Sequence, residues 1–447
     1  MRFDIPENIQ TVLECLRRAG FRAVPVGGCV RDLLLGNTPH DWDITTSATP
    51  TEMLAVFSGF RMLKIGQGAA KHGTITVVID HTPIEVTTFR QDGTYSDSRR
   101  PDSVCFSRAI ETDLARRDFT INAMCLGEDD SIIDLFGGQQ DLQKGIIRAI
   151  GAPERRFGED ALRILRALRF AAVLGFVIEP QTAGSMLQHT GQLAALSAER
   201  IRAELEKLLC APDCARVLME YHEIIFAVFP ELKPTLGLEQ RKDYHCYDVY
   251  AHTAHAVGFA PPESVLKVAL LLHDIGKPLC ADGHGHFYGH AAQSAKLAEV
   301  VLRRLKFGNT AREQILFLVQ RHDLSLCDAD KIKIKKLLSK YGFAAMRRLL
   351  LVQKADIMAQ RPDMRQERLA GLERVECLMQ SIAAQRLPLN RSELVVSGRD
   401  IIAAGVSQGP QLGVLLDLLL QKVLDETLPN EAEALLEYVR LNRPDEI

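Results

Sequence analysis

The sequence lacks a long hydrophobic run, a paired cysteine motif and a strong net charge. No stretch of about 18 apolar residues occurs in the 447 residues, so no membrane association is expected. The ten cysteines form no CxxC pair, which favours reduced and mostly buried thiols. The segment MRFDIPENIQ does not resemble a signal peptide, so we expect a cytoplasmic protein, with no obligate protein partner evident. A net charge of −3 gives no general attraction to nucleic acid, which would have to bind local basic patches.

The residue pattern divides the chain into a mixed N-terminal part and a helical remainder. Residues 1–148 combine an amphipathic helix over ENIQTVLECLRRAGF with β-branched segments such as TITVVID, which predicts a small α/β domain. From residue 149 onward, Leu, Ala, Arg and Glu recur at helical spacing. We therefore expect an α+β protein with a head (1–148), a helical neck (149–235), a helical body (236–360) and a helical tail (361–447).

Two aspartates, Asp41 and Asp43, lie in the segment DWDITT, which resembles a strand. Side chains at positions i and i+2 of a strand point the same way, so the two carboxylates are expected to converge. Glu85, in PIEVTTFR, would join them if its strand lay beside DWDI. Three carboxylates suit an oxygen-ligated cation such as Mg²⁺ and can hold two ions about 3.5–4 Å apart. The alternative is a solvated strand end.

A glycine pair, Gly27 and Gly28, precedes these aspartates and lies between the strand RAVPV and the helical segment VRDLLLG. Glycine lets backbone N–H groups approach a phosphate, and a helix N-terminus favours an anion. Arg31, one turn into that helix, has a guanidinium that could grip a triphosphate. The glycine pair followed by the DxD motif resembles the signature of the DNA polymerase β-like nucleotidyltransferases.

Three further segments extend this resemblance. LARRDFTINAM (114–124), RRFGEDALRILRALRF (155–170) and SAERIRAELEKLL (197–209) resemble motifs of the bacterial class II tRNA nucleotidyltransferases and their poly(A) polymerase relatives. The resemblance implies a polymerase β-like head with a mixed sheet, followed by an all-α neck, body and tRNA-contacting tail. It also implies addition of C, C and A to the 3′ end of tRNA from CTP and ATP with Mg²⁺, without a nucleic-acid template and with release of pyrophosphate.

The segment ARRD supplies candidate contacts to the sugar and phosphates of a nucleotide. Asp118 can accept a hydrogen bond from a ribose 2′-hydroxyl, the group that distinguishes an RNA precursor. Arg117 and Asn122 can hold the sugar and the phosphates. An exposed charged turn is the alternative interpretation of this segment.

The segment EDALRILRALRF predicts a base-recognition helix. Its charged residues recur every third position and are expected to share one helix face: Asp160, Arg163, Arg166 and Arg169. Asp160 could accept the amino proton of cytosine or adenine while Arg163 donates to the ring acceptor. Uracil and guanine would place a carbonyl against the carboxylate, at a cost of roughly 1 to 3 kcal/mol. The alternative is ordinary surface Asp–Arg pairing.

The helical part contains a second set of candidate metal ligands. In chain order they are His252, His273, Asp274, His290, His322 and Asp356. Imidazoles mixed with carboxylates suit a transition metal such as Mn²⁺, Ni²⁺ or Co²⁺. The order resembles the HD metal phosphohydrolases, with His290 and His322 available for a second ion. The same six residues could also bind metal only to hold the helices together.

Several alternatives stay open from the sequence. A poly(A) polymerase would use the same site, and a partial enzyme would add only CC or only A. An HD phosphohydrolase with an RNA-binding N-terminal domain belongs to another class.

The polar loop 91–104 has full length. The resemblance implies that such a loop reshapes the pocket from CTP to ATP, so its length favours complete CCA addition. A passive surface loop is the alternative. The basic segment 328–350 could contact an RNA backbone or form a solvated face.

Overall fold

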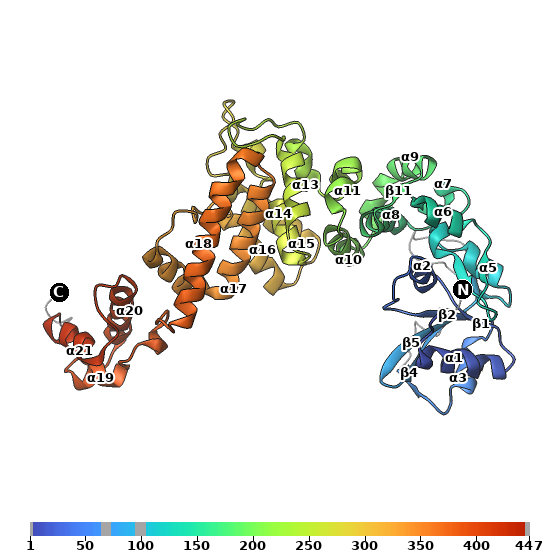
Figure 1. The fold of residues 1–447 in the computed structure, drawn as a ribbon, viewed down its shortest axis with the longest axis horizontal. Helices are drawn as coiled ribbons and strands as arrows, with labels where there is room; N and C mark the ends of the chain where they lie inside the picture. Colours follow the sequence, from blue (N-terminus) through green and yellow to red (C-terminus); the bar gives the residue numbers. More distant parts are fainter. Residues whose placement is uncertain (1–2, 64–72, 94–103, 443–447) are drawn as a thin grey trace. The chain divides into compact units, whose positions relative to one another are not determined.

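The computed structural model describes residues 3–63, 73–93 and 104–442 (Figure 1). The chain forms two compact units, residues 1–230 and residues 231–447. The expected α+β class is confirmed, because a mixed sheet near the N-terminus is followed by helices. Within the described ranges, no helix is long and apolar enough to cross a membrane. The finer division into four domains stays a prediction.

The first unit contains a five-stranded mixed sheet of order β1-β2-β5-β4-β3. Its strands are Ala23–Pro25 (β1), Asp43–Thr46 (β2), Arg61–Met62 (β3), Thr74–Ile79 (β4) and Thr82–Thr88 (β5). β2 and β5 run parallel, whereas the other neighbouring strands are antiparallel. β4 and β5 form a tight hairpin, in which Asp80 and His81 adopt φ values of 47° and 64°.

Helices α1 (Glu7–Arg18) and α3 (Pro50–Val56) pack on one face of this sheet (Figure 1). In α1 the buried apolar side chains, Ile9, Val12, Leu13 and Leu16, recur at helical spacing and join the core of the sheet. The expected helix ends at Arg18, just before Gly20, whose φ of 84° cannot continue a right-handed helix. α3 begins with a capping box between Thr49 and Glu52.

The rest of the first unit is mainly helical. Among the described residues, its helices are Gly28–Leu34 (α2), Ile110–Ala115 (α5), Gly138–Lys144 (α6), Pro153–Glu159 (α7), Leu162–Leu174 (α8), Pro180–Gln188 (α9), Ala198–Leu209 (α10), Cys214–Glu220 (α11) and His222–Val228 (α12). Three two-stranded sheets pair Arg90–Asp92 (β6) with Val104–Phe106 (β7), Met124–Leu126 (β8) with Ile132–Asp134 (β9), and Ile146–Ile147 (β10) with Val177–Ile178 (β11). Most side chains of α8 are buried, and α8 packs against α10 and α11.

The second unit is built from helices. They are Val249–Phe259 (α13), Ser264–Leu272 (α14), His290–Arg304 (α15), Asn309–Arg321 (α16), Lys331–Met358 (α17), Arg365–Ala384 (α18), Gly398–Ala403 (α19), Pro410–Leu424 (α20) and Ala432–Leu441 (α21). α17 is interrupted at Gly342, where φ is 77° and ψ is 162°, so it consists of two helical segments that meet at a kink. The helices α19 to α21 bury a separate apolar cluster.

The basic segment 328–350, for which RNA contact and a solvated face were both open, lies mostly in α17. Three of its lysines pair with acidic residues just after α20: Lys331 and Lys335 with Glu426, and Lys336 with Asp425. Lys335 is also buried. These lysines therefore hold α20 against α17, and their charge is partly neutralised within the second unit.

Candidate nucleotide and metal sites

A cavity of about 1290 Å³ in the first unit brings together the residues predicted to bind nucleotide. All of them except Gly27 line it: Gly28, Arg31, Asp41, Asp43, Glu85, Arg117, Asp118, Asn122, Asp160, Arg163, Arg166 and Arg169. These residues are far apart in the sequence and come from the sheet, α2, α8 and the loops between them. The fold thus places carboxylates and guanidinium groups around one space. Of the predicted specificity loop 91–104, residues 94–103 lie outside the described residues.

The carboxylates of this cavity come from two parallel strands. Asp43 is the first residue of β2 and lies directly opposite Glu85 of β5. Asp41 lies in a bend two residues before β2, so the expectation that both aspartates belong to one strand is wrong for Asp41. Burial raises the pKa of Asp43, an effect that Arg117 opposes and the negative charge of Asp41 increases. Like charges held together in this way fit a divalent cation.

The glycine turn lies beside the arginines. Gly27 has a φ of 83°, and a Cβ atom there would lie 2.7 Å from Nη1 of Arg117. Only glycine allows this conformation together with such a close approach. Arg31 of α2 is buried and donates hydrogen bonds to Oδ1 of Asp32 and, at 2.8 Å, to Oδ1 of Asn122. Its guanidinium is therefore held in one orientation at the cavity wall.

Asp118 is buried and forms an ion pair with the partly exposed Arg166. Nε and Nη2 of Arg166 lie 2.7 Å and 2.6 Å from Oδ2 of Asp118. Oδ1 of Asp118 accepts hydrogen bonds from the backbone N–H of Phe119 and from the side chain of Asn122. Burial opposes ionisation, but Arg166 and these hydrogen bonds lower the pKa of Asp118 to about 2. Asp118 is thus an ionised acceptor on the cavity wall.

Asp160 does not lie on the base-recognition helix, so the prediction of one continuous face is wrong at this residue. Its backbone is extended (φ −150°, ψ 103°) at the end of α7, and α8 begins at Leu162. Oδ1 accepts from the N–H of Leu162 at 3.0 Å, and Oδ2 accepts from Arg200 at 2.7 Å. Arg163 lies on α8 and donates to Glu159 at 2.6 Å. Both members of the predicted base-reading pair therefore have protein partners in this structure.

Helix α10 contributes residues that the sequence reasoning missed. Arg200 and Lys207 line the cavity, and Glu204 accepts from Nε of Arg169 at 2.6 Å. These three residues recur at positions i, i+4 and i+7, so the helical period of SAERIRAELEKLL was a signal for one shared face. Trp42, the single tryptophan of the chain, also lines the cavity.

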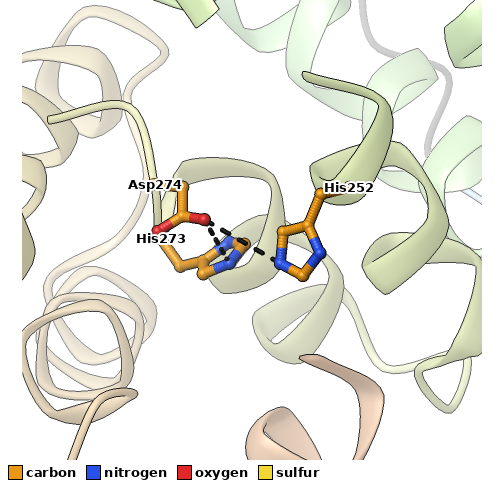
Figure 2. Close-up of side chains that lie close together, drawn as sticks. All are labelled: His252, His273 and Asp274. Carbon is orange, nitrogen blue, oxygen red and sulfur yellow. Dashed lines mark ion pairs between the residues drawn. The ribbon is translucent and has the colours of Figure 1, made fainter. Parts of the chain in front are cut away.

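The second unit contains a cavity of about 440 Å³ that is lined by five of the six predicted ligands of the HD constellation: His273, Asp274, His290, His322 and Asp356. The sixth, His252, lies beside Asp356. The two carboxylate oxygens of Asp274 face different histidine pairs. Nε2 of His273 and of His252 lie 3.1 Å and 3.9 Å from Oδ2 (Figure 2). Nε2 of His290 and of His322 lie 3.4 Å and 3.7 Å from Oδ1. In each triad the candidate ligand atoms lie within 4.8 Å of one another, so Asp274 could bridge two metal ions.

The charges around Asp274 support this interpretation. Asp274 is buried, and among the described residues its Oδ1 accepts no hydrogen bond. Burial opposes ionisation, but His273 and Lys277 hold the pKa of Asp274 well below its usual range. Asp356 lies beside the first triad, with Oδ1 2.8 Å from Nε2 of His252. An ionised buried oxygen without a donor fits a cation.

Two further residues of this cavity were missed from the sequence. Nζ of Lys277 lies 2.7 Å from Oδ2 of Asp274, and the spacing of three residues in HDIGK was a signal for this contact. The ring of His245 packs edge-on against His252, with centroids 5.0 Å apart. Burial and the neighbouring His252 lower the pKa of His245 to about 3, which keeps this imidazole neutral.

Comparison with known proteins shows the family of the chain. Residues 23–148 match the family "Poly A polymerase head domain", residues 175–236 match "Probable RNA and SrmB-binding site of polymerase A", and residues 287–439 match "tRNA nucleotidyltransferase domain 2". A CCA-adding enzyme of Limosilactobacillus fermentum is 35% identical over 431 residues, which cover 96% of this chain and 95% of that protein. The chain belongs to the CCA-adding enzyme family.

Solved structures of this family have the same fold. The Bacillus stearothermophilus CCA-adding enzyme, crystallised in complex with CTP, is 28% identical, with a TM-score of 0.70 and 99% of each chain covered. The Thermotoga maritima CCA-adding enzyme, complexed with tRNA, is 21% identical, with a TM-score of 0.58, 98% of this chain and 96% of that chain covered. The resemblance to the class II tRNA nucleotidyltransferases is therefore confirmed.

Proposed function

We propose that the protein adds C, C and A to the 3′ end of tRNA from CTP and ATP, without a nucleic-acid template and with release of pyrophosphate. The observation that carries the proposal is the parallel pairing of Asp43 with Glu85 at the wall of a cavity that is otherwise rich in arginines. Nucleotidyl transfer needs little covalent chemistry from the protein. Positioning of the reactants and neutralisation of charge provide most of the rate.

The carboxylates Asp41, Asp43 and Glu85 would hold Mg²⁺, because hard oxygen ligands are those that this ion prefers. Bound Mg²⁺ would favour ionisation of the attacking 3′-hydroxyl and balance the charge of the triphosphate. Two arginines of the chain would contact the phosphates directly. Arg31 and Arg117 would bind the triphosphate, since guanidinium groups match phosphate oxygens in geometry and charge.

The selection of nucleotides would depend on two aspartates. Asp118 would accept a hydrogen bond from the ribose 2′-hydroxyl. Asp160 would accept the amino proton of cytosine or adenine, while Arg163 donates to the ring acceptor. The bonds of Asp160 to Arg200 and to the N–H of Leu162 do not prevent this, because a carboxylate offers about four acceptor positions.

The test uses purified protein and tRNA that lacks its 3′ CCA. CTP alone, ATP alone, both together and all four nucleotides are supplied, and the products are resolved on a sequencing gel. We expect addition of two residues with CTP and of three with CTP plus ATP. A long ladder with ATP alone would indicate a poly(A) polymerase, and an arrest after CC or a requirement for CC-ended tRNA would indicate a partial enzyme.

A second candidate function is hydrolysis of a 2′,3′-cyclic phosphate or a phosphomonoester in the second unit, with Mn²⁺, Ni²⁺ or Co²⁺ bound. The two triads that share Asp274 favour it over a purely structural metal site. Water would add to phosphorus, the ring P–O bond would break, and a proton would pass to the freed ribose oxygen. Cleavage at O3′ would free the 3′-hydroxyl and leave a 2′-phosphomonoester, which a second hydrolysis would remove as inorganic phosphate before nucleotide addition.

Hydrolysis of 2′,3′-cyclic AMP with each metal added, by the wild type and by Asp274→Ala, tests this function. We expect metal-dependent turnover by the wild type and none by the variant. Absence of turnover in the wild type, or its persistence in the variant, would assign a structural role to the HD constellation. CCA addition should survive Asp274→Ala in either case.

A further inference from the structure

One aromatic side chain of the first unit, Phe170 of α8, lies among three arginines of the nucleotide cavity. The Cζ atoms of Arg31, Arg166 and Arg169 lie 5.3 Å, 5.4 Å and 4.1 Å from the centroid of its ring. Arg31 belongs to α2, whereas the other two arginines belong to α8. The ring of Phe170 thus connects the helix after the glycine turn with the base-recognition helix.

Each of these guanidinium groups is also fixed by polar partners. The pairs are Arg31 with Asp32 and Asn122, Arg166 with Asp118, and Arg169 with Glu204. These bonds use only part of the five N–H donors of each guanidinium. The polar partners restrain each guanidinium along its edge, while the negative π face of Phe170 attracts the cations. The remaining donors are thereby kept in place for a ligand.

We infer that Phe170 is a positioning residue for nucleotide binding, which holds Arg31, Arg166 and Arg169 in the directions that the nucleotide requires. This inference rests on the proposed nucleotidyl transfer. Phe170 is only 6% exposed, Arg169 already lies over its ring, and Phe119 packs against it at 5.9 Å with an interplanar angle of 81°. The surroundings of Phe170 therefore favour the positioning of arginines over the stacking of a nucleobase.

Equilibrium dialysis with labelled CTP and ATP tests the inference independently of catalysis. Phe170→Leu keeps an apolar side chain but removes the π face, and loss of these contacts should raise both dissociation constants roughly tenfold. The KM values should rise by the same factor, while kcat changes less. Phe170→Tyr, which keeps the ring, should bind within about threefold of the wild type.

Phe57→Leu is the matched control. Phe57 is fully buried in the apolar core of the five-stranded sheet, so its replacement removes the same apolar volume from the first unit. The dissociation constants of Phe57→Leu should stay near the wild-type values. Equal weakening by Phe57→Leu and Phe170→Leu would show that loss of core packing alone is responsible and would overturn the inference.

Failure of the proposed function has a different signature. If the wild type bound neither CTP nor ATP, the proposed nucleotidyl transfer would be wrong. If the wild type bound both and folded Phe170→Leu bound them equally well, only the positioning role of Phe170 would be wrong. Should Phe170→Leu fail to fold, Phe170→Met serves in the same comparison, because an unbranched side chain adapts more readily to the core.

Discussion

The ion pair between the buried Asp118 and the partly exposed Arg166 should stabilise the first unit measurably even without nucleotide. Replacing Asp118 by Asn keeps the size of the side chain but removes its charge. Arg166 would then keep its position near Phe170 without a carboxylate partner. We expect Asp118→Asn to lower the free energy of unfolding of the first unit, because the charged hydrogen bonds between the carboxylate of Asp118 and the guanidinium of Arg166 are lost.

The magnitude follows from the pKa of Asp118. This pKa falls from an ordinary value of 3.8 to about 2 in the folded protein. A tenfold change in a protonation constant corresponds to about 1.4 kcal/mol, so a fully shielded pair would contribute about 2.5 kcal/mol. The side chain of Arg166 is 35% exposed, and solvent screening reduces the expected contribution to about 1 to 2 kcal/mol. The charge of Asp118 also raises the pKa of Arg166, but this shift reflects the same interaction and contributes no further stability.

The pH dependence has a defined sign. A carboxylate whose pKa is lower in the folded state stabilises the protein above its unfolded pKa. The contribution of Asp118 should therefore be complete above about pH 4 and decline as the pH falls from about 4 towards 2. The difference between wild type and Asp118→Asn should be constant between about pH 5 and pH 8.

Urea unfolding followed by tryptophan fluorescence provides the assay. Trp42 is the only tryptophan and lies in the first unit, so its signal reports that unit and not the second one. A double-mutant cycle that combines Asp118→Asn with Arg166→Gln isolates the free energy of the interaction between these two side chains. The exposed Asp4, replaced by Asn, is a control in which no loss is expected. A coupling energy near zero, or a difference that is unchanged at pH 3, would refute the argument.

Asp41→Ala or Asp43→Ala should abolish nucleotide transfer while the fold is retained, because each removes a predicted metal ligand; transfer within tenfold of the wild type would contradict the metal assignment. Asp160→Ala should relax the selectivity for C and A by roughly tenfold to a hundredfold, measured as UTP and GTP incorporation. Loss of all activity with unchanged selectivity would instead assign a structural role to that residue. Deletion of residues 93–98 should leave CC addition nearly normal and stall the chain before A, whereas equal loss of C and A incorporation would mean that the loop only supports the fold. Chelation with EDTA of protein loaded with Mn²⁺ should lower the melting temperature of the second unit, and Asp274→Asn should make the melting temperature insensitive to EDTA.

The contact between Asp43 and Glu85 could be predicted because both segments have strong β-branched patterns. The prediction required only that the two strands be neighbours. In the structure they form a parallel pair in which Asp43 and Glu85 occupy the same register position, so their carboxylates come together. Asp41 was misplaced because a strand pattern does not define where the strand begins. The residue still lines the cavity, since a bend two residues before β2 leaves it near Asp43.

The error at Asp160 has a physical cause. A repeat of every third residue is compatible with one helix, but it does not exclude a break between two helices. Asp160 has a side chain that accepts from the N–H of Leu162 and so competes with helical hydrogen bonding at the start of α8. The ion pair with Arg200 could not be read from the pattern either, because the two residues are 40 positions apart and meet only through the packing of α8 on α10.

The two cavities stabilise their buried charged groups in different ways. In the first unit, the arginines lie beside carboxylates such as Asp118 and Glu204, so the wall is electrostatically stable before a nucleotide arrives. In the second unit, Oδ1 of Asp274 is buried among histidines and accepts no hydrogen bond from the described residues. A buried acceptor without a donor is costly, and a cation removes that cost. The nucleotide site is thus organised to exchange its ligand at every turnover, whereas the geometry of the HD site favours a cation that stays bound.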